Sequence, residues 1–414
     1  MNMDARSALK PDRLRPRGSS QGGLRQYNER VVLQAVRLHG ALPGAEIARL
    51  TGLTAQTVSL ITKRLLDDGL LLKQAPQRGK VGQPSVPLVL NPDGAYAIGI
   101  KVGRRSLDTL LVDFNGVPRQ RWSMDYLFPD PAEVLAEIGG RLQEIGELLG
   151  PGGTPRLQGI GIAAPLQMGG WQQLLGIDPR LAARWERVDL ANEVAQLSPL
   201  PVELLKDTAA ASVAELVAGR GRSLSSFLYI FVDTFIGGGL VIDSHLRSGT
   251  HGNAGAIGSL PLGLSAPDAA AAPPQLLSVA SLLNLERRYE AAGLDPGATV
   301  DTRALTLPWL PHTEAWLTEA AAATALAINS AACLLDLEGV IVDGSFSREL
   351  LAALMAELAP ALGRHSWEGV QRPPLLSGSI GPDARALGGA LLPLYANFAP
   401  DRELFLKAVK AAEA

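Results

Sequence analysis

Residues 44–69, GAEIARLTGLTAQTVSLITKRLLDDG, carry the clearest structural pattern in this chain. Their apolar residues recur at three- and four-residue steps, break at Thr51-Gly52 and then resume, which predicts two helices that share one buried face. The apolar set is Ile47, Ala48, Leu50, Leu53, Val58, Ile61, Leu65 and Leu66. Thr54 can cap the second helix, because its hydroxyl can accept a hydrogen bond from a first-turn amide. Two short helices joined by a tight turn are typical of a helix-turn-helix.

The second helix of this pair is expected to turn small or hydrogen-bonding side chains outward, and none of them is a carboxylate. These residues are Ala55, Gln56, Thr57, Ser59, Thr62 and Lys63. Such a surface can lie in the major groove of DNA, where the base edges offer donors, acceptors and thymine methyl groups. An ordinary helical hairpin has the same apolar pattern, so the helices alone leave both interpretations open.

A glycine-rich basic loop, QRGKVGQ, follows the second helix. Residues 70–73 and 85–90 predict short strands on either side of it, and a hairpin in this place is typical of a winged helix-turn-helix. Arg78 and Lys80 are then expected to meet phosphates or to enter the minor groove, although a solvated turn is the alternative. Upstream, residues 28–39 predict an amphipathic helix that would complete a three-helix unit.

The composition describes a folded protein with an uneven distribution of charge. A chain of 414 residues is long enough for two or three domains with sizeable cores. Its net charge is −3, but residues 1–90 hold 14 Lys and Arg against 6 Asp and Glu, whereas the remainder holds 24 against 35. A basic N-terminal part on an acidic body favours contact with nucleic acid through one end of the molecule.

Several other classes of protein are disfavoured. Cys333 is the only cysteine, which excludes an internal disulfide and a multi-cysteine zinc site, and its apolar neighbours predict that it is buried. No stretch reaches the roughly 18–20 charge-free apolar residues of a membrane helix, and residues 1–23 lack the apolar core of a secretory signal. We therefore expect a cytoplasmic protein without membrane contact. Residues 1–25 predict a flexible basic arm, which either adds non-specific DNA affinity or is a plain disordered tail.

The rest of the chain predicts two copies of one β-β-β-α-β unit. In the first copy, strands are expected at 96–102, 107–112 and 117–122, a helix at 131–149 and a further strand at 157–163. In the second copy, strands are expected at 227–232 and 240–242, helices near 275–292 and 314–335, and strands at 340–342 and 375–378. Two such copies predict two lobes whose strand-end loops converge on a ligand cleft.

The order of these segments resembles a transcriptional regulator of the ROK family, which unites sugar-responsive repressors and sugar kinases on an actin-like fold. The resemblance covers about residues 28–397. Each marker is weak alone, but their order and spacing are specific. The markers are GQPSVPLVLNPDGAYAIGI, GIGIAAPL, RWERVDL, LPVELLKDTAAASVAELVAG, TFIGGGLVID, GTHGNAGAIGSLPLG and GVIVDGSFS.

The resemblance implies an α/β fold with an N-terminal winged helix-turn-helix followed by a two-lobed, actin-like or ribonuclease H-like ROK body. The winged head is then expected at 26–91, the first lobe at 92–210 and the second lobe at 211–414, with a C-terminal helix that can return to the first lobe. The implied partners are double-stranded DNA and a small-molecule effector, a sugar or a sugar derivative. A homodimer or homotetramer is expected, because paired heads on a symmetric oligomer read paired half-sites.

The residues that carry kinase chemistry in this family differ here. Kinase members place an acidic residue after the first strand of the first lobe, whereas this chain has Lys101, a cation that cannot ligate a metal. The Gly-Thr-Gly pattern that would cradle phosphate is Asp233-Thr234-Phe235. A repressor without catalytic residues or a cofactor is therefore expected. The alternatives are a sugar kinase with an appended head, in which Asp207 is the general base, and a regulator that binds DNA without any ligand.

The resemblance also implies an effector site. The family's Asn-Asp sugar contact is Lys206-Asp207 here, so Asp207 is the best effector candidate, with a salt bridge to the adjacent cation or a helix cap as the alternative role. The Glu-x-Gly-His element that holds sugar and zinc is replaced by residues 256–259, AIGS, and no cysteine cluster follows, so no metal site is expected. Loop and turn roles remain the alternative for the other effector candidates. These are His251, Asn253, Gly237 and Gly238.

Overall fold

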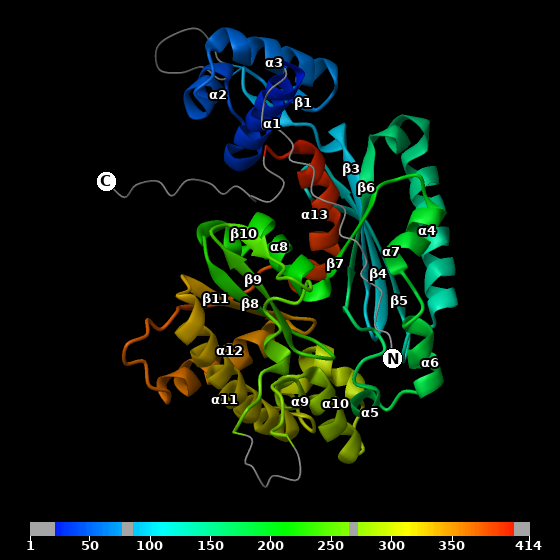
Figure 1. Cartoon of the computed structure of the whole chain (residues 1–414), viewed down its shortest axis with the longest axis vertical. Coiled ribbons are helices and arrows are strands. Elements are labelled where there is room, and N and C mark those ends of the chain that lie inside the picture. Colours follow the sequence, from blue (N-terminus) through cyan, green and yellow to red (C-terminus); the bar gives the residue numbers. More distant parts are fainter. Residues whose placement is uncertain (1–20, 77–85, 265–271, 401–414) are drawn as a thin grey trace, which may run out of the picture.

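The computed structural model describes residues 21–76, 86–264 and 272–400, and it consists of a small head on a two-lobed body (Figure 1). The described part of the head comprises α1 (Gln21–His39), α2 (Gly44–Thr51), α3 (Ala55–Asp67), β1 (Leu71–Lys73) and β2 (Leu88–Leu90). Helix α1 begins at Gln21, earlier than its predicted start at residue 28 and inside the segment expected to be a flexible arm. The rest of that arm lies outside the described residues.

Helices α2 and α3 meet on the apolar face that the sequence predicts. Their buried residues are Ile47, Val58, Ile61, Thr62 and Leu65. Between them, Gly52 has a φ of 69°, a left-handed conformation that glycine adopts without a Cβ clash, and its N–H donates to the carbonyl of Ala48. Thr54 caps α3 as predicted, because its hydroxyl accepts the N–H of Thr57 at 3.2 Å. Strands β1 and β2 pair antiparallel and form the predicted hairpin.

The head is packed onto the body rather than tethered to it. Arg37 of α1 donates to the carbonyl of Phe114 at 2.7 Å, and its guanidinium lies 4.9 Å from the centre of the Phe114 ring. The ring of Phe398 packs edge-on against Phe114, with centroids 4.7 Å apart. Asn91, directly after β2, donates its amide to the carbonyl of Gly69 at 2.6 Å. The head and the first lobe therefore share one continuous core.

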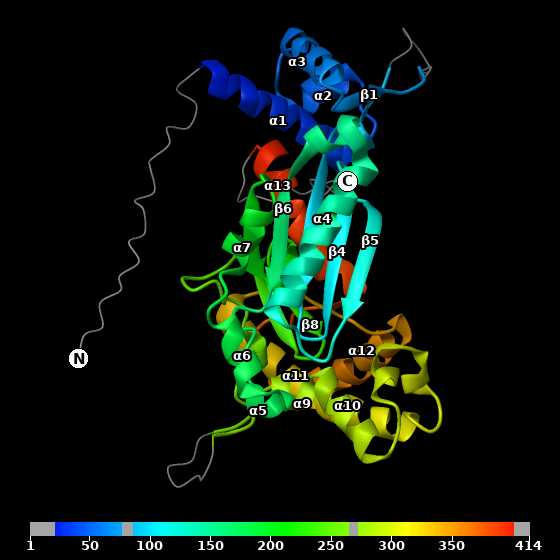
Figure 2. The same ribbon diagram turned by 90° about the vertical axis from the view of Figure 1, so that its right-hand side faces the viewer.

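The first lobe is built on a five-stranded mixed sheet with the order β5-β4-β3-β6-β7. Its strands are β3 (Tyr96–Val102), β4 (Ser106–Asp113), β5 (Pro118–Asp125), β6 (Leu157–Ala164) and β7 (Val202–Lys206). Its helices are α4 (Pro131–Gly153), α5 (Gln172–Leu175), α6 (Pro179–Trp185) and α7 (Leu190–Leu197). Strand β3 coincides with its predicted range, and β7 is a fifth strand that the sequence pattern does not predict. Helices α4 and α7 cover the outer face of this sheet (Figure 2).

The second lobe repeats this arrangement, with the strand order β10-β9-β8-β11-β12. Its strands are β8 (Phe227–Val232), β9 (Gly237–Ile242), β10 (His245–Arg247), β11 (Gly339–Gly344) and β12 (Leu375–Ser377). Its outer helices are α9 (Leu277–Ala280), α10 (Leu282–Ala291), α11 (Leu310–Leu335) and α12 (Arg348–Gly363). In each sheet the first three strands are antiparallel neighbours and the fourth is parallel to the first, so the predicted internal repeat is present.

Two helices, α8 (Asp207–Ala218) and α13 (Ala384–Phe398), lie between the two sheets (Figure 1). They pack closely, because a Cβ built on Gly388 of α13 would stand 1.7 Å from the carbonyl oxygen of Ala210 in α8. Gly161 of β6 allows a similar approach, since its Cβ would stand 1.9 Å from the carbonyl oxygen of Gly389. The C-terminal helix α13 thus packs on the first sheet, and α8 connects it to the second.

Helix α11 corrects the prediction that Cys333 is buried. The cysteine is exposed, although the neighbouring Ala332 is buried, because the two lie on different sides of the helix. By length and composition α11 is the one helix in the described ranges that could cross a membrane, but half of its most apolar window is buried. The buried side of α11 packs into the core of the second lobe, where Trp316 and Ile328 are fully buried.

Candidate functional site

The outward face of α3 is the first candidate surface, at the end of the head farthest from the body (Figure 2). Of the predicted DNA-contacting residues, Ala55, Gln56, Ser59 and Lys63 are exposed and Thr57 is half-buried. Leu60, which is not among the predicted contacts, lies beside them with 55% of its surface exposed. The sequence signal for Leu60 is its position as an apolar residue between polar residues on the outward face of the helix.

Thr62 does not belong to this surface, so its prediction as an outward residue is wrong. It is buried, and its hydroxyl donates to the carbonyl of Val58 at 2.8 Å. Thr62 lies one helical turn after Val58 and next to Ile61, so it shares their inward face. Its hydroxyl is satisfied within the helix, which makes burial of a polar side chain tolerable there.

The basic wing residues cannot be placed, since Arg78 and Lys80 lie outside the described residues. The strands that lead into and out of that loop are described, and Lys73 at the end of β1 is exposed. Arg64 adds an exposed cation on α3, where it forms a salt bridge with Glu29 of α1 at 3.5 Å. The described part of the head therefore carries exposed cations beside the polar face of α3.

The second candidate site is a cavity of about 440 Å³ between the two lobes. Four of the five predicted effector residues line it, namely Asp207, His251, Asn253 and Gly237. They come from the start of α8, from the loop after β10 and from the start of β9. The other wall belongs to the first lobe and includes Arg104, Gln167 and Trp171.

Gly238, the fifth predicted effector residue, does not line the cavity. Its carbonyl accepts the hydroxyl of Thr208 at 2.7 Å and Nζ of Lys206 at 3.3 Å. A Cβ at this position would stand 2.8 Å from the carbonyl oxygen of Gly255. Glycine is therefore required here for close backbone packing, and the residue supports the wall of the cavity from behind.

Asp207 is the first residue of α8, and its Oδ1 accepts the N–H of Thr208 at 2.8 Å. The N-cap position of α8 is Lys206, so Asp207 lies inside the first turn and not at the capping position that the sequence left open; a carboxylate there is favourable at the positive end of the helix. Asp207 is nevertheless only half-buried and lines the cavity. In the part of the chain that the structure describes, it forms no salt bridge with Lys206 or with any other cation.

Two cationic side chains line the same cavity as this carboxylate. Lys206, at the end of β7, is half-buried, and burial lowers the pKa of its ammonium group while Asp207 partly opposes that shift. Burial also lowers the pKa of Arg104, which Asp207 and Asp233 partly oppose. No sequence pattern places Arg104 in a site, because it lies in a short turn after β3 and reaches its neighbours only through the fold.

The guanidinium of Arg104 packs against two aromatic rings that also contact each other. Its centre lies 4.9 Å from the ring of Phe235 and 5.6 Å from that of Trp171, distances at which a cation is attracted to a π-face. One of its nitrogens donates to the carbonyl of Gln167 at 3.0 Å. Its Nε is buried and has no hydrogen-bond partner among the described residues.

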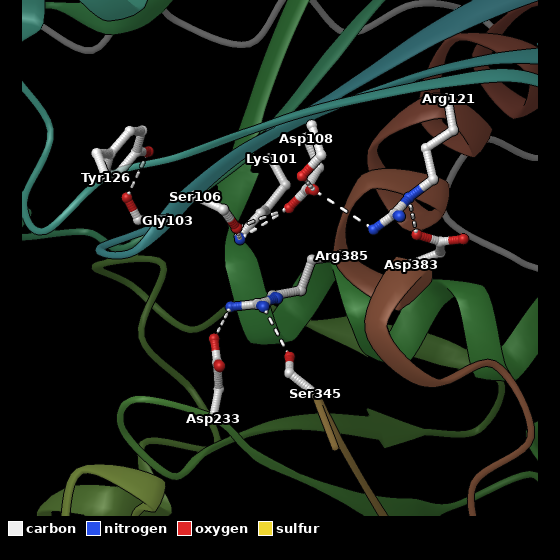
Figure 3. Close-up of polar contacts among 11 residues, drawn as sticks. Lys101, Gly103, Ser106, Asp108, Arg121, Tyr126, Asp233, Ser345, Asp383 and Arg385 are labelled. Carbon is white, nitrogen blue, oxygen red and sulfur yellow. Dashed lines mark hydrogen bonds and ion pairs between the residues drawn. The ribbon is translucent and has the colours of Figure 1, made fainter. Parts of the chain in front are cut away.

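A buried charge network occupies the positions at which the kinase residues would be expected (Figure 3). Lys101 of β3 is 4% exposed, and its Nζ donates to Asp108, the residue opposite it on β4, at 2.9 Å. Asp108 also accepts the hydroxyl of Ser123 at 2.6 Å. Burial and the nearby Arg385 lower the pKa of Lys101, although Asp108 opposes both effects.

Arg385 extends this network to the second lobe (Figure 3). From the start of α13 its guanidinium binds the carboxylate of Asp233, which follows β8, and donates to Ser345 at 3.0 Å. Burial alone would raise the pKa of Asp233, but Arg385 and Lys101 hold it below its ordinary value. The loop expected to cradle phosphate is thus occupied by a carboxylate that is paired with a cation of the chain itself.

A resident metal would need a cluster of ligands. Within residues 21–76, 86–264 and 272–400, no three His, Cys, Asp or Glu side chains form a group that could hold one.

Comparison with known proteins identifies the body. The model of the ROK family matches residues 97–394, which span both lobes and both central helices. The chain belongs to the ROK family. The match begins within β3, so the head of this ROK protein lies outside the matched region.

Several relatives of this ROK protein are named as regulators. The xylose repressor of Bacillus subtilis is 24% identical over 252 residues, which cover 60% of this chain and 64% of the repressor. The chain therefore matches slightly less than two thirds of that repressor's length. A transcriptional regulator of Mycobacterium tuberculosis is 28% identical over 239 residues, 56% of this chain and 52% of the regulator. An uncharacterized protein of Sinorhizobium fredii is 24% identical and matches more fully, over 90% of this chain and 91% of its own length.

Solved structures place the ROK body beside both regulators and kinases. A ROK family transcriptional regulator, a homolog of the E. coli MLC protein, has a TM-score of 0.67 and 20% identity, covering 92% of this chain and 98% of its own. A ROK glucokinase from Streptomyces griseus, in complex with glucose and AMPPNP, has a TM-score of 0.57 and 21% identity and covers 72% of this chain and 99% of its own. These likenesses establish the actin-like, sugar-kinase-like fold of the body.

Proposed function

We propose that this ROK protein is a sequence-specific DNA-binding transcriptional repressor whose body binds a sugar or a related small molecule. The observation that carries the proposal is the outward face of α3, which presents hydrogen-bonding, cationic and apolar side chains on a head built around a capped helix pair and a hairpin. Regulators and repressors among the relatives support the same interpretation.

The dimensions of α3 suit a major groove. Gln56, Leu60 and Lys63 are exposed at spacings of four and three residues, so they share one face of the helix. At a rise of 1.5 Å per residue this row is about 10 Å long, which spans about three base pairs at 3.4 Å each. The helix pair and the hairpin then correspond to the parts of a winged helix-turn-helix. In this arrangement Gln56 contacts base edges, and Lys63 contacts phosphate or guanine.

We infer that the body has lost kinase activity. Lys101 is paired with Asp108, and Asp233 is paired with Arg385, so protein charges fill the positions at which a kinase needs a metal-organising acid and a phosphate cradle. The competing hypothesis, a sugar kinase with an added head and Asp207 as general base, requires these pairs to open before nucleotide can enter.

A path through the body can connect the cavity to the head. Helix α8 begins at Asp207 in the cavity and packs along α13. Near its end, α13 carries Tyr395, whose ring lies 5.8 Å from the guanidinium of Arg37 in the head. A ligand that shifts α8 would therefore also shift α13 and its contact with Arg37 of the head. It can change DNA affinity only if it binds one arrangement of the lobes better than the other.

Two copies of the chain would supply the paired heads that a repressor needs. Half-sites of paired recognition helices lie about 34–36 Å apart or at multiples of that distance. The homodimer or homotetramer is thus part of the proposal, and the spacing of half-sites in the bound DNA tests it.

The test is genome-wide footprinting of the purified chain and of Gln56→Ala and Lys63→Ala variants. We expect discrete protected sites with paired half-sites, a relaxed base preference for Gln56→Ala, and uniformly weaker binding for Lys63→Ala. An unchanged base preference in Gln56→Ala would show that α3 is oriented differently on DNA. Turnover of ATP with a hexose or amino sugar, abolished by Asp207→Asn, would favour the kinase instead.

A further inference from the structure

The cavity between the lobes has an excess of positive charge. Its charged lining consists of Arg104 and Lys206 against Asp207. Where ROK kinases have the Glu and His of the Glu-x-Gly-His element, this chain has Ala256 and Ser259, both of which line the cavity. A negative charge is thus missing from one wall, while cations are present on the other.

These cations are not neutralised by direct pairing. In the described ranges neither Arg104 nor Lys206 forms a salt bridge, and Asp207 directs one carboxylate oxygen to the N–H of Thr208. Arg385, by contrast, is held by Asp233 in the adjacent network. Asp207 acts on both cations without a direct ion pair, so a ligand of opposite charge can still form ion pairs with them.

Both cations keep donors that a ligand could use. An ammonium has three N–H donors, and Lys206 uses one in a long bond of 3.3 Å to the carbonyl of Gly238. A guanidinium has five, and Arg104 uses one toward Gln167 in the part of the chain that the structure describes. Arginine suits a carboxylate or phosphate because its planar fork can donate two parallel hydrogen bonds.

The remaining lining suits a small hydroxylated molecule. Trp171 and Phe235 line the cavity, and the guanidinium of Arg104 lies over both rings, so they place this cation at the cavity wall. Asp207 and Asn253 supply acceptors and an amide for hydroxyl groups. A cavity of about 440 Å³ is large enough for a monosaccharide with one added anionic group.

We infer that the effector is an anionic sugar derivative, with a carboxylate or phosphate group held between Lys206 and Arg104 and its hydroxyls facing Asp207 and Asn253. This inference rests on the proposed function and specifies the ligand of that same site. A neutral sugar is not expected to be the effector, because the anionic group supplies most of the difference in affinity between the two kinds of ligand.

Matched ligand series test it. Binding to the full chain is measured by calorimetry for hexoses and pentoses, each as the neutral sugar, its sugar acid and its phosphate ester. We expect at least one acid or phosphate to bind ten-fold or more tightly than its neutral parent, and the series itself distinguishes carboxylate from phosphate. Neutral parents that bind as tightly as their anions, or a complete series without any binding anion, would overturn the inference.

Variants locate the charge. Lys206→Gln and Arg104→Gln should each weaken the anion at least ten-fold while leaving the neutral parent nearly unchanged. Arg105→Gln is the matched control, because this neighbouring arginine pairs with Glu286 at 3.2 Å and does not line the cavity. The assigned contacts would be contradicted if Arg105→Gln lost as much affinity for the anion as the other two variants, or if Lys206→Gln lost none. Melting temperatures of all three variants verify folding.

The two proposals can fail separately. Specific DNA sites in footprinting together with no anion binding would refute the anionic effector and leave the DNA-binding function intact. Anion binding without any specific DNA site would refute the repressor and leave the charge preference of the cavity standing.

Discussion

The buried pair of Lys101 and Asp108 makes a quantitative prediction about stability. Their side chains are only 5% and 10% exposed, and Asp108 also accepts hydrogen bonds from Ser106 and Ser123. The Asp108→Asn variant keeps the shape but leaves the ammonium of Lys101 buried without its counter-charge. Breaking such a pair costs about 3–5 kcal/mol. At about 2–4 °C per kcal/mol for a large domain, the melting temperature should fall by roughly 6–20 °C.

A double variant is the control. Lys101→Met with Asp108→Leu removes both charges and keeps apolar volume between β3 and β4. Replacing a whole buried pair by apolar residues is often neutral or stabilising, so this variant should melt close to the parent chain. Urea unfolding and thermal melting, followed by circular dichroism, measure all three proteins.

The pH dependence follows from the same pair. Burial alone would raise the pKa of Asp108, but Lys101 and Ser123 lower it below its ordinary value. The ionised Asp108 carboxylate therefore stabilises the folded chain fully above the ordinary pKa of about 3.9. This stabilisation is lost as the pH falls through the lower pKa of the folded state. The difference in free energy of unfolding between the parent chain and Asp108→Asn should therefore become smaller below about pH 4.

At high pH the lysine decides the outcome. Burial lowers the pKa of Lys101, so unfolding takes up a proton and stability rises with pH toward the ordinary lysine value of about 10.4. Asp108→Asn should thus regain stability as the pH rises toward the ordinary lysine value, and the double variant should not. The reasoning would be refuted if Asp108→Asn lowered the free energy of unfolding by less than about 1 kcal/mol at pH 7. It would also be refuted if the double variant lowered this free energy equally.

Four further variants test the head. Thr54→Ala removes the cap of α3 and should lower the free energy of opening of that helix by about 1 kcal/mol, measured by amide hydrogen exchange. Leu60→Ala should relax a preference for thymine at one position of a selected DNA site without changing the salt dependence, whereas Lys63→Ala should reduce the slope of log affinity against log salt by about 1. Arg37→Met removes the bond to the carbonyl of Phe114, and it should retain DNA binding while weakening the response of that binding to the effector, measured by titration with and without ligand.

Much of the fold could be predicted because its signals are local. Strand β8 (Phe227–Val232) is a short, continuous apolar run bounded by turn residues, and its predicted range coincides with the observed one. The cap at Thr54 also depends on residues within one turn. Strand β7 was missed because VELLK has weak alternation, and pairing with β6 rather than its own sequence makes it a strand.

The errors have a physical origin in helix faces. Thr62 was placed outward because it is polar, but its position relative to Val58 turns it inward. Cys333 was placed inward because nearly every neighbour is apolar, so the sequence does not show which side of α11 packs. In both cases the angle around the helix decided the burial, and residue type was misleading.

The site depends on contacts between segments that are distant in the chain. The resemblance assigns Asp207, His251 and Asn253 to one effector site, and the fold brings these distant residues into one cavity. Arg104 joins them from the first lobe, and no periodicity or spacing in the sequence indicates this. Arg385 likewise reaches Asp233 from a helix near the C-terminus. Such convergence follows from the close packing of α8 and α13 between the sheets, which local patterns do not encode.

Equilibrium titration of two labelled duplexes tests the central claim most directly. One carries a site selected by the protein, and the other carries the same bases in scrambled order. At physiological ionic strength the account predicts a preference of about 10³-fold or more for the selected site, and affinities that fall steeply as salt rises. Equal affinity for both duplexes, or no binding to either at low ionic strength, would contradict a DNA-reading head on a ligand-sensing ROK body.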